Sequence, residues 1–183
     1  MTTPAQDRPV AVFDIDGVLA DVRHRLHLVE RRPKDWDGFF DAAVDDPPLE
    51  QGVQLALASA QDCDLVYLTG RPERCRADTL AWLERHGLPA GPLSMRRGRD
   101  FRPARVAKLE LLRRLARTRT VAVAVDDDAQ VCDAYEGAGF RVLRAGWMPT
   151  APPSASAAGP APTRAPADVA AVLHEAQEES GRT

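Results

Sequence analysis

The sequence predicts a doubly wound, Rossmann-like α/β domain, in which a parallel sheet carries helices on both faces. Two observations support this fold class. Short apolar runs rich in β-branched residues recur along the chain, and amphipathic helical patterns lie between them. Strands that alternate with helices are joined by right-handed crossovers, which produce a parallel sheet covered on both sides.

Four apolar runs are expected to be the main strands of this sheet. Such runs are typical of strands that are covered on both faces. They lie at 9–14 (PVAVFD), 63–69 (CDLVYLT), 120–126 (TVAVAVD) and, more weakly, 140–146 (FRVLRAG). The segment PLSM at 92–95 is expected to add a short strand between two helices.

Three segments between these runs have the apolar spacing of helices. They span residues 73–86, 104–117 and 129–138. The first pattern stops at Gly87, with Pro89 just beyond it, which is typical of a helix C-terminus. Arginines occupy the outer face of the second pattern, so this helix is expected to expose a basic surface.

The chain is expected to contain one folded domain at residues 9–148. Within it, residues 22–48 are polar with isolated aromatics, which predicts a small helical insertion. Residues 1–8 are expected to form a flexible N-terminus. Residues 149–167 are rich in alanine, proline and serine and predict a flexible linker, and a short helix with a tail is expected at 168–183.

The composition is that of a globular protein in water. Of the 183 residues, 44% are hydrophobic and 28% are charged. The formal net charge of -3 produces no overall positive potential that would attract nucleic acid. Three cysteines form no CxxC pair and are interpreted as reduced thiols. Because the sequence shows neither a secretory signal nor about 18 consecutive apolar residues, we expect a cytoplasmic protein with no membrane partner.

Acidic and polar residues stand at the carboxyl ends of three predicted strands. Asp14 and Asp16 follow the first strand, Thr69 ends the second, and Asp126 and Asp127 end the strand at 120–126. Parallel sheets bind ligands at this edge. Carboxylates gathered there repel one another unless a divalent cation offsets their charge, and Mg²⁺ prefers a few carboxylate oxygens with water and phosphate. The sequence therefore predicts a Mg²⁺ site at this edge.

Four motifs occur in order along the chain: DIDG at 14–17, LTGR at 68–71, Lys108 and VDDD at 125–128. Their order resembles that of the haloacid dehalogenase superfamily of phosphotransferases. Each motif has an ordinary structural alternative when it stands alone, since DxDG also occurs in turns and Asp128 could simply cap a helix. Lys108 is one of only two lysines among 24 basic residues, which favours a specific role.

Further segments resemble the 3′-phosphatase domain of polynucleotide kinase-phosphatases over about residues 9–147. They are Arg25, KDWDGFF at 34–40, RPERCRADTLAWL at 71–83 and MRRGRDFRP at 95–103. Relatives of this kind carry acidic residues shortly before the lysine, where this chain has Ala104 and Arg105, and often an arginine where it has Asp128. These departures concern substrate preference rather than the chemistry.

The resemblance implies a role for each motif residue. Asp14 would be the nucleophile that forms an aspartyl-phosphate, and Asp16 the general acid and base, with its backbone carbonyl facing the metal. Thr69 would bind a phosphoryl oxygen, and Lys108 would offset negative charge as a compact cation. The implied Mg²⁺ ligands are Asp14, Asp16, Asp126 and Asp127.

Substrate-binding residues are expected among the glycine and arginines near these motifs. Arg25 and Arg71 match arginines that the resemblance places near the substrate phosphate, and Gly70 lies between Thr69 and Arg71. Arginines at 96–105, including Arg96 and Arg102, are expected to border the catalytic edge and to follow a phosphate backbone, which predicts salt-sensitive binding. A solvated basic loop is the alternative interpretation.

Spacing favours an open site and a large substrate. Only 39 residues separate Thr69 from Lys108, and they are filled by a helix, a short strand and a loop, so no large cap domain fits there. An open site suits a phosphorylated nucleic-acid end better than a small sugar phosphate. No GxxxxGK[ST] motif occurs, so any kinase or ligase partner is expected to be a separate chain.

Three functions are therefore weighed. The first is a Mg²⁺-dependent polynucleotide 3′-phosphatase acting on DNA ends, RNA ends or nucleotides. The second is a 5′-nucleotidase or another small-molecule phosphatase, which DxDGVLAD also resembles. The third is a catalytically idle module that binds phosphate ends, although such a module would not need the acid and base at Asp16.

Overall fold

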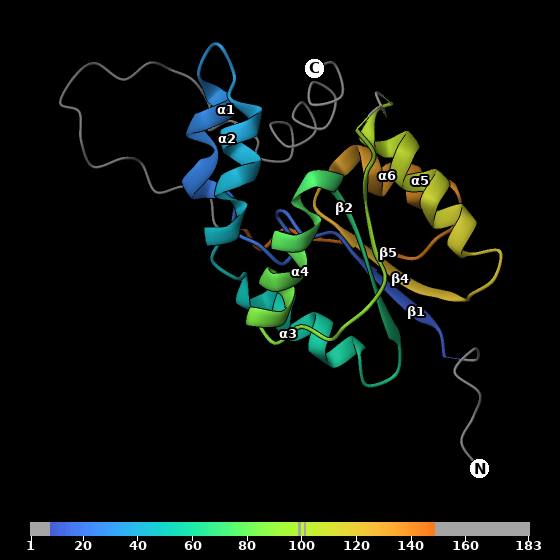
Figure 1. Ribbon diagram of the computed structural model, residues 1–183. Helices are drawn as coiled ribbons and strands as arrows, with labels where there is room; N and C mark the ends of the chain where they lie inside the picture. The colour runs from blue at the N-terminus through green and yellow to red at the C-terminus, as the bar shows by residue number, and fades with distance from the viewer. Residues whose placement is uncertain (1–7, 99, 101, 149–183) are drawn as a thin grey trace.

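The computed structural model describes residues 8–98, 100 and 102–148. Within them, five strands form one parallel sheet in the order β3-β2-β1-β4-β5 (Figure 1). The strands are β1 (Val10–Phe13), β2 (Asp64–Pro72), β3 (Leu93–Arg96), β4 (Val121–Asp126) and β5 (Val142–Arg144). The predicted N-terminus at 1–8, apart from Arg8, and the predicted linker and helix at 149–183 lie outside the described residues.

Helices cover both faces of the sheet, as the doubly wound prediction requires (Figure 1). On one face, α3 (Glu50–Ser59) and α4 (Arg76–Arg85) pack against side chains such as Ala11 and Phe13 of β1. On the other face, α5 (Ala104–Leu115) and α6 (Ala129–Gly137) pack against Val10 and Val12. Successive β1 side chains therefore enter opposite cores, because strand side chains alternate between the two faces. The predicted fold class is confirmed.

The central position of β1 places the candidate site. Phe13, its last residue, is paired with Tyr67 of β2 and with Val125 of β4. The residues that follow Phe13 and Val125 therefore lie at the same carboxyl edge of the sheet. Asp14 and Asp126 are these residues, and they become neighbours although 112 positions separate them in the sequence.

The segment between β1 and α3 forms a small helical layer of its own. It contains η1 (Arg23–Arg25), α1 (His27–Glu30), α2 (Trp36–Asp41) and η2 (Ala42–Asp45). Its apolar side chains form a separate buried cluster that includes Leu26, Phe39 and Phe40 and also contacts Cys75 and Met95 of the main domain. The layer agrees with the expected insertion, and no large cap is present in the described part of the chain.

The observed elements differ from the expected ones at two places. Strand β2 continues to Pro72, beyond the expected end at residue 69, and a 3-10 turn, η3 (Glu73–Cys75), precedes α4. No bounds were predicted for α3, which begins directly after the insertion. Among the described helices, none has the length and apolar character that a membrane span requires.

Candidate active site

Lys108 joins the two carboxylates that end the central strands. Its Nζ donates a hydrogen bond to Asp14 Oδ2 at 2.8 Å and another to Asp126 Oδ2 at 2.9 Å. All three side chains are buried. Asp14 also accepts a hydrogen bond from the Ile15 backbone N–H at 2.8 Å, which fixes the orientation of its carboxylate. The fold thus assembles one ammonium and two carboxylates from β1, α5 and β4.

Asp127 completes an acidic cluster with these two aspartates. One carboxylate oxygen from each of Asp14, Asp126 and Asp127 lies within 4.8 Å of the others. Three carboxylates outnumber the single ammonium of Lys108, so the cluster carries excess negative charge. This donor set fits Mg²⁺, which binds proteins through one or more carboxylates and completes its shell with water and phosphate.

Burial and the neighbouring charges shift the pKa values of the cluster. Burial raises the pKa of Asp14 to about 7, although the neighbouring Lys108 opposes this shift. Burial and the charge of Asp126 raise the pKa of Asp127 well above its usual range. Burial alone would lower the pKa of Lys108, but Asp126 and Asp14 raise it well above its ordinary value, so this group is charged. A divalent cation would stabilise the ionised carboxylates.

Gly17 leaves space for the carboxylate of Asp127 in the acidic cluster. Its φ of +78° lies in the left-handed region that favours glycine. A Cβ at this position would lie 2.0 Å from Asp127 Oδ2, closer than any side chain could accommodate. The glycine of DIDG therefore permits both the turn after β1 and the close approach of Asp127.

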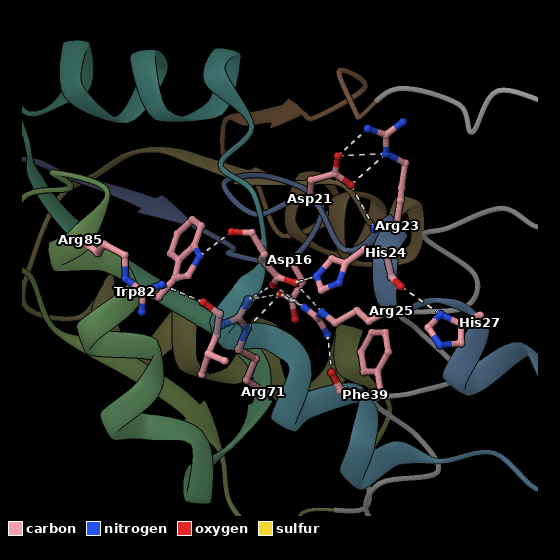
Figure 2. A network of polar contacts seen from close by, with 12 residues as sticks. Asp16, Asp21, Arg23, His24, Arg25, His27, Phe39, Arg71, Trp82 and Arg85 are labelled. Atoms are coloured by element: carbon pink, nitrogen blue, oxygen red, sulfur yellow. Dashed lines mark hydrogen bonds and ion pairs between the residues drawn. The ribbon is translucent and has the colours of Figure 1, made fainter.

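Asp16 is held by two buried arginines rather than by the acidic cluster (Figure 2). Its Oδ1 accepts hydrogen bonds from Arg25 Nη2 at 2.7 Å and from Arg71 Nε and Nη2 at 2.9 and 2.6 Å. Burial alone would raise the pKa of Asp16, but Arg71 and Arg25 lower it to about 2. The carboxylate of Asp16 is therefore ionised in this arrangement.

Asp46 is a further member of this network that the sequence analysis did not identify. Its two carboxylate oxygens accept hydrogen bonds from Arg25 Nε at 2.7 Å, Arg25 Nη2 at 2.8 Å and Arg71 Nη2 at 2.7 Å. His24 Nε2 lies 2.8 Å from Asp46 Oδ1. The two arginines thus bridge two buried carboxylates, one from the DIDG motif and one from the end of the insertion.

Aromatic residues hold this network in place. The guanidinium of Arg25 lies 4.1 Å from the ring centroid of Phe39 and donates a hydrogen bond to the Phe39 carbonyl at 3.2 Å (Figure 2). Trp82 of α4 donates its Nε1–H to the backbone carbonyl of Asp46 at 2.8 Å. The KDWDGFF segment therefore supplies the ring beneath Arg25, and α4 anchors the loop that carries Asp46.

Thr69 and Gly70 lie at the end of β2 beside Lys108, and with it they line one cavity. Thr69 is buried, and its Oγ1 accepts a hydrogen bond from the Arg71 backbone N–H at 3.3 Å. Asp128 has a structural role, because its carboxylate accepts hydrogen bonds from the first backbone N–H groups of α6, Gln130 at 2.7 Å and Val131 at 3.2 Å. The helix-cap alternative for Asp128 is thus confirmed.

Arg96 and Arg102, both expected to bind substrate, have contacts within their own loop. Arg96 is buried and donates to the backbone carbonyls of Asp100 at 2.8 Å and Arg102 at 2.7 Å. Arg102 forms ion pairs with Asp100 and with Glu110 of α5. These contacts shape the loop that precedes α5, and both arginines line the cavity that Lys108 also lines. Substrate binding by these two residues stays a prediction.

Comparisons with known proteins identify relatives of this domain. A family model described as "Polynucleotide kinase PNKP phosphatase domain" matches residues 8–146. A solved chain from "Structure of the Pnkp1/Rnl/Hen1 RNA repair complex" has a TM-score of 0.63 and 23% identity, over 78% of this chain and 45% of that chain. A chain from "Structure of Pnkp1/Rnl/Hen1 complex" has a TM-score of 0.62 and 21% identity, over 79% of this chain and 48% of that chain.

The structural likenesses show the fold, and this chain spans less than half the length of either solved chain. No curated protein matches the sequence. The family model covers most of the chain and includes every residue of the acidic cluster and of the arginine network. The chain is therefore a haloacid dehalogenase-type phosphatase that belongs to the family of the polynucleotide kinase PNKP phosphatase domain.

Proposed function

We propose that this protein is a Mg²⁺-dependent phosphomonoesterase that removes 3′-phosphates from nucleic-acid ends through an aspartyl-phosphate intermediate. The observation that carries this proposal is the buried cluster in which Lys108 contacts Asp14 and Asp126. The second acidic residue of the motif, Asp16, lies in a separate arginine network beside it. A nucleophile, a charge-neutralising cation and an acid therefore come from one strand end and its neighbours.

The first chemical step breaks the phosphoester bond. A carboxylate oxygen of Asp14 attacks phosphorus, the bond from phosphorus to the 3′ oxygen breaks, and Asp16 gives the leaving oxygen a proton. In the second step, Asp16 takes a proton from water, whose oxygen attacks phosphorus and releases inorganic phosphate from Asp14. In both steps, Lys108 offsets the negative charge of the phosphoryl group, and Thr69 orients the group by binding one of its oxygens.

The hydrogen bonds from the two arginines control the protonation state of Asp16. With Arg25 and Arg71 bound, the pKa of Asp16 is about 2, so the residue carries no proton to donate near neutral pH. A phosphate group that accepts hydrogen bonds from the two arginines would weaken their hydrogen bonds to Asp16. The pKa of Asp16 would then rise. The same two arginines thus serve substrate binding and acid activation, while Asp46 keeps them in place.

Mg²⁺ fits the acidic cluster and would be held by the side chains of Asp14, Asp126 and Asp127, with the Asp16 backbone carbonyl as a further predicted ligand. When bound, the ion supplies positive charge beside the phosphoryl oxygens and a template for their orientation. The excess negative charge of the cluster, described above, supports this assignment.

Nucleic acid as the substrate class, and partner chains, are supported by the comparisons. The family model is that of a polynucleotide kinase phosphatase domain, and the similar solved chains come from Pnkp1/Rnl/Hen1 complexes, one of them described as an RNA repair complex. We infer that this phosphatase works in nucleic-acid end repair together with kinase or ligase activities. The free thiols Cys63, Cys75 and Cys132 support a cytoplasmic location.

A phosphate-release assay with a panel of substrates tests this function. We expect Mg²⁺-dependent release from 3′-phosphorylated oligonucleotides, with lower kcat/KM for 3′- and 5′-mononucleotides and no release after EDTA. Asp14→Asn removes the nucleophile and is expected to lower kcat by about 10³-fold or more. The exposed Asp62→Asn variant, which makes the same change away from the site, is the matched control.

Three outcomes would contradict the proposal. A large preference for 5′-mononucleotides would favour a nucleotidase. Tight binding of 3′-phosphorylated ends without turnover would favour the idle binding module. Appreciable turnover by Asp14→Asn would exclude the covalent mechanism.

A further inference from the structure

A cavity opens directly beside the predicted catalytic residues Thr69 and Lys108. It has a volume of about 120 Å³ and lies between the end of β3, the loop that follows it and α5. Apolar side chains form much of its wall, and arginines stand around it. The apolar residues are Met95, Ala104, Ala107 and Leu111, and the arginines include Arg97 and Arg114.

The space exists because α5 presents alanines to it. Ala104, Ala107 and Leu111 stand three and four positions apart and so share one face of the helix. Lys108, next in the chain to Ala107, reaches the acidic cluster from the same helix. The helix that supplies the catalytic cation thus also supplies the wall of the cavity, and a larger side chain at position 107 would fill it.

The size of the cavity corresponds to one ring. An engineered protein cavity of about 150 Å³ with apolar walls takes up benzene, so a cavity of about 120 Å³ is suited to one ring of similar size. Most of the exposed lining is apolar, which suits the face of a heterocycle better than the hydroxyl groups of a sugar phosphate.

The charges at the edge of the cavity suit a nucleotide. Arg97 is exposed, and no ion pair is found for it within the described residues. A guanidinium group can stack on a base or bind a phosphate oxygen. The acidic residues at the edge, Asp100 and Glu110, are already paired with Arg102, which limits their repulsion of an anionic ligand.

We propose that this cavity binds the nucleoside that carries the phosphate to be removed. The proposal rests on the function proposed above, because the phosphate is then bound beside Thr69 and Lys108. In a nucleoside 3′-phosphate, the group next to the phosphate is the sugar with its base. The cavity is the space next to those two residues, its apolar wall faces the base, and Arg97 contacts the base or the phosphate on the 5′ side of the nucleoside.

Filling the cavity tests this assignment. Ala107→Leu keeps a strong helix former and places a larger apolar side chain in the space. The assay compares uridine 3′-phosphate with acetyl phosphate, whose leaving group is too small to occupy the cavity. We expect the ratio of kcat/KM for the nucleotide to kcat/KM for acetyl phosphate to fall at least tenfold, mainly through a higher nucleotide KM.

Two other variants complete the test. Ala81→Leu makes the same change at an exposed position of α4, on the opposite face of the sheet, and is expected to leave the ratio unchanged. Arg97→Gln changes the exposed edge of the cavity without adding volume, and it is expected to raise the nucleotide KM severalfold. This variant still tests the cavity if Ala107→Leu does not fold.

The outcomes separate this inference from the proposed function. Nucleotide hydrolysis with an unchanged ratio in Ala107→Leu, or in Arg97→Gln where the first variant does not fold, would overturn the role of the cavity and leave the phosphatase function intact. A wild-type protein that hydrolyses acetyl phosphate but neither uridine 3′-phosphate nor a 3′-phosphorylated oligonucleotide would overturn the proposed substrate class, and this inference with it.

Discussion

Asp46 shows how a single buried carboxylate can determine the geometry of a phosphate-binding site. It contacts Arg25 and Arg71 through both of its oxygens and lies outside the catalytic motifs. Without it, two buried guanidinium groups would share the single carboxylate of Asp16. Breaking a buried ion pair by removal of one partner is strongly destabilising, because the remaining charge is left without compensation.

We therefore expect Asp46→Asn to affect both stability and activity. The free energy of unfolding should fall by about 3 kcal/mol, as typical for the loss of one member of a buried ion pair. The activity should show a kcat/KM lower by about 10-fold to 100-fold, because misplaced positioning groups have costs of this size. Urea unfolding and steady-state kinetics with a 3′-phosphorylated oligonucleotide measure the two effects.

The neighbouring Asp45→Asn is the matched control, since Asp45 is exposed and carries the same charge. A positioning role predicts that KM rises more than kcat falls, and that Asp46→Glu, which restores the charge, regains part of the lost activity. Equal effects of the Asp45 and Asp46 substitutions would contradict this role.

The residues at the strand ends could be predicted from the sequence, but Asp46 could not. Asp14 and Asp126 follow recognisable strands, and parallel strands bring their ends together whatever the sequence distance. Asp46 follows no strand and belongs to no spacing pattern, because the loop between η2 and α3 carries it to the arginines. Its only sequence signal is an acidic residue near the end of an insertion, which is indistinguishable from a solvated surface charge.

At the scale of elements, strands were easier to predict than the helix after the insertion. Short apolar runs rich in β-branched residues, such as that around β1, favour a buried strand. Helix α3 has Gly52 in its first turn, which weakens the helical pattern. The structure explains this glycine, because a Cβ there would lie 1.8 Å from the carbonyl oxygen of Val18 in the loop after β1. Close packing of α3 against that loop thus overrides local propensity.

The loop after β1 gives a prediction about Gly17. Gly17→Ala should lower the free energy of unfolding by about 1–2 kcal/mol through its left-handed backbone alone. The added Cβ should also displace the carboxylate of Asp127, which lies 2.0 Å from its position. We therefore expect the variant to lose most of the rise in melting temperature that Mg²⁺ gives the wild-type protein, as measured by thermal unfolding with and without the ion.

Gly139→Ala separates backbone strain from displacement of Asp127. Gly139 has a similar φ of +86°, and nothing lies within 4 Å of a Cβ built on it. This variant should be destabilised to a similar extent and should still be stabilised by Mg²⁺. A full Mg²⁺ response in Gly17→Ala would show that Asp127 does not need the space beside this glycine.

For the whole molecule, the distribution of charge predicts more about the binding of long substrates than the net charge does. The net charge is only -3, yet the outer surface of α5 and the turn that follows it carry the exposed residues Arg105, Arg113 and Arg117. No ion pair is found for Arg113 or Arg117 within the described residues. The same helix bears Lys108 at its inner face, so this basic surface begins beside the candidate active site and continues away from it.

This surface predicts salt-dependent action on long substrates. Arg113 lies in the last turn of α5, and Arg117 lies in the turn that follows it. If both contact phosphates of a single strand, Arg113→Gln/Arg117→Gln should reduce the slope of log(1/KM) against log[salt] by about 1.4, since each contact contributes roughly 0.7. Steady-state kinetics at several salt concentrations with a 3′-phosphorylated 12-mer measure this slope.

The prediction depends on location rather than on charge alone, and two comparisons isolate it. Arg31→Gln/Arg141→Gln removes the same charge from exposed positions outside α5 and should leave the slope unchanged. A 3′-mononucleotide has no backbone phosphate besides the one removed, so its KM should be the same in the α5 double variant and in the wild-type protein. If the two double variants changed the slope equally, general electrostatic attraction would account for the effect, and α5 would not be the path of the strand.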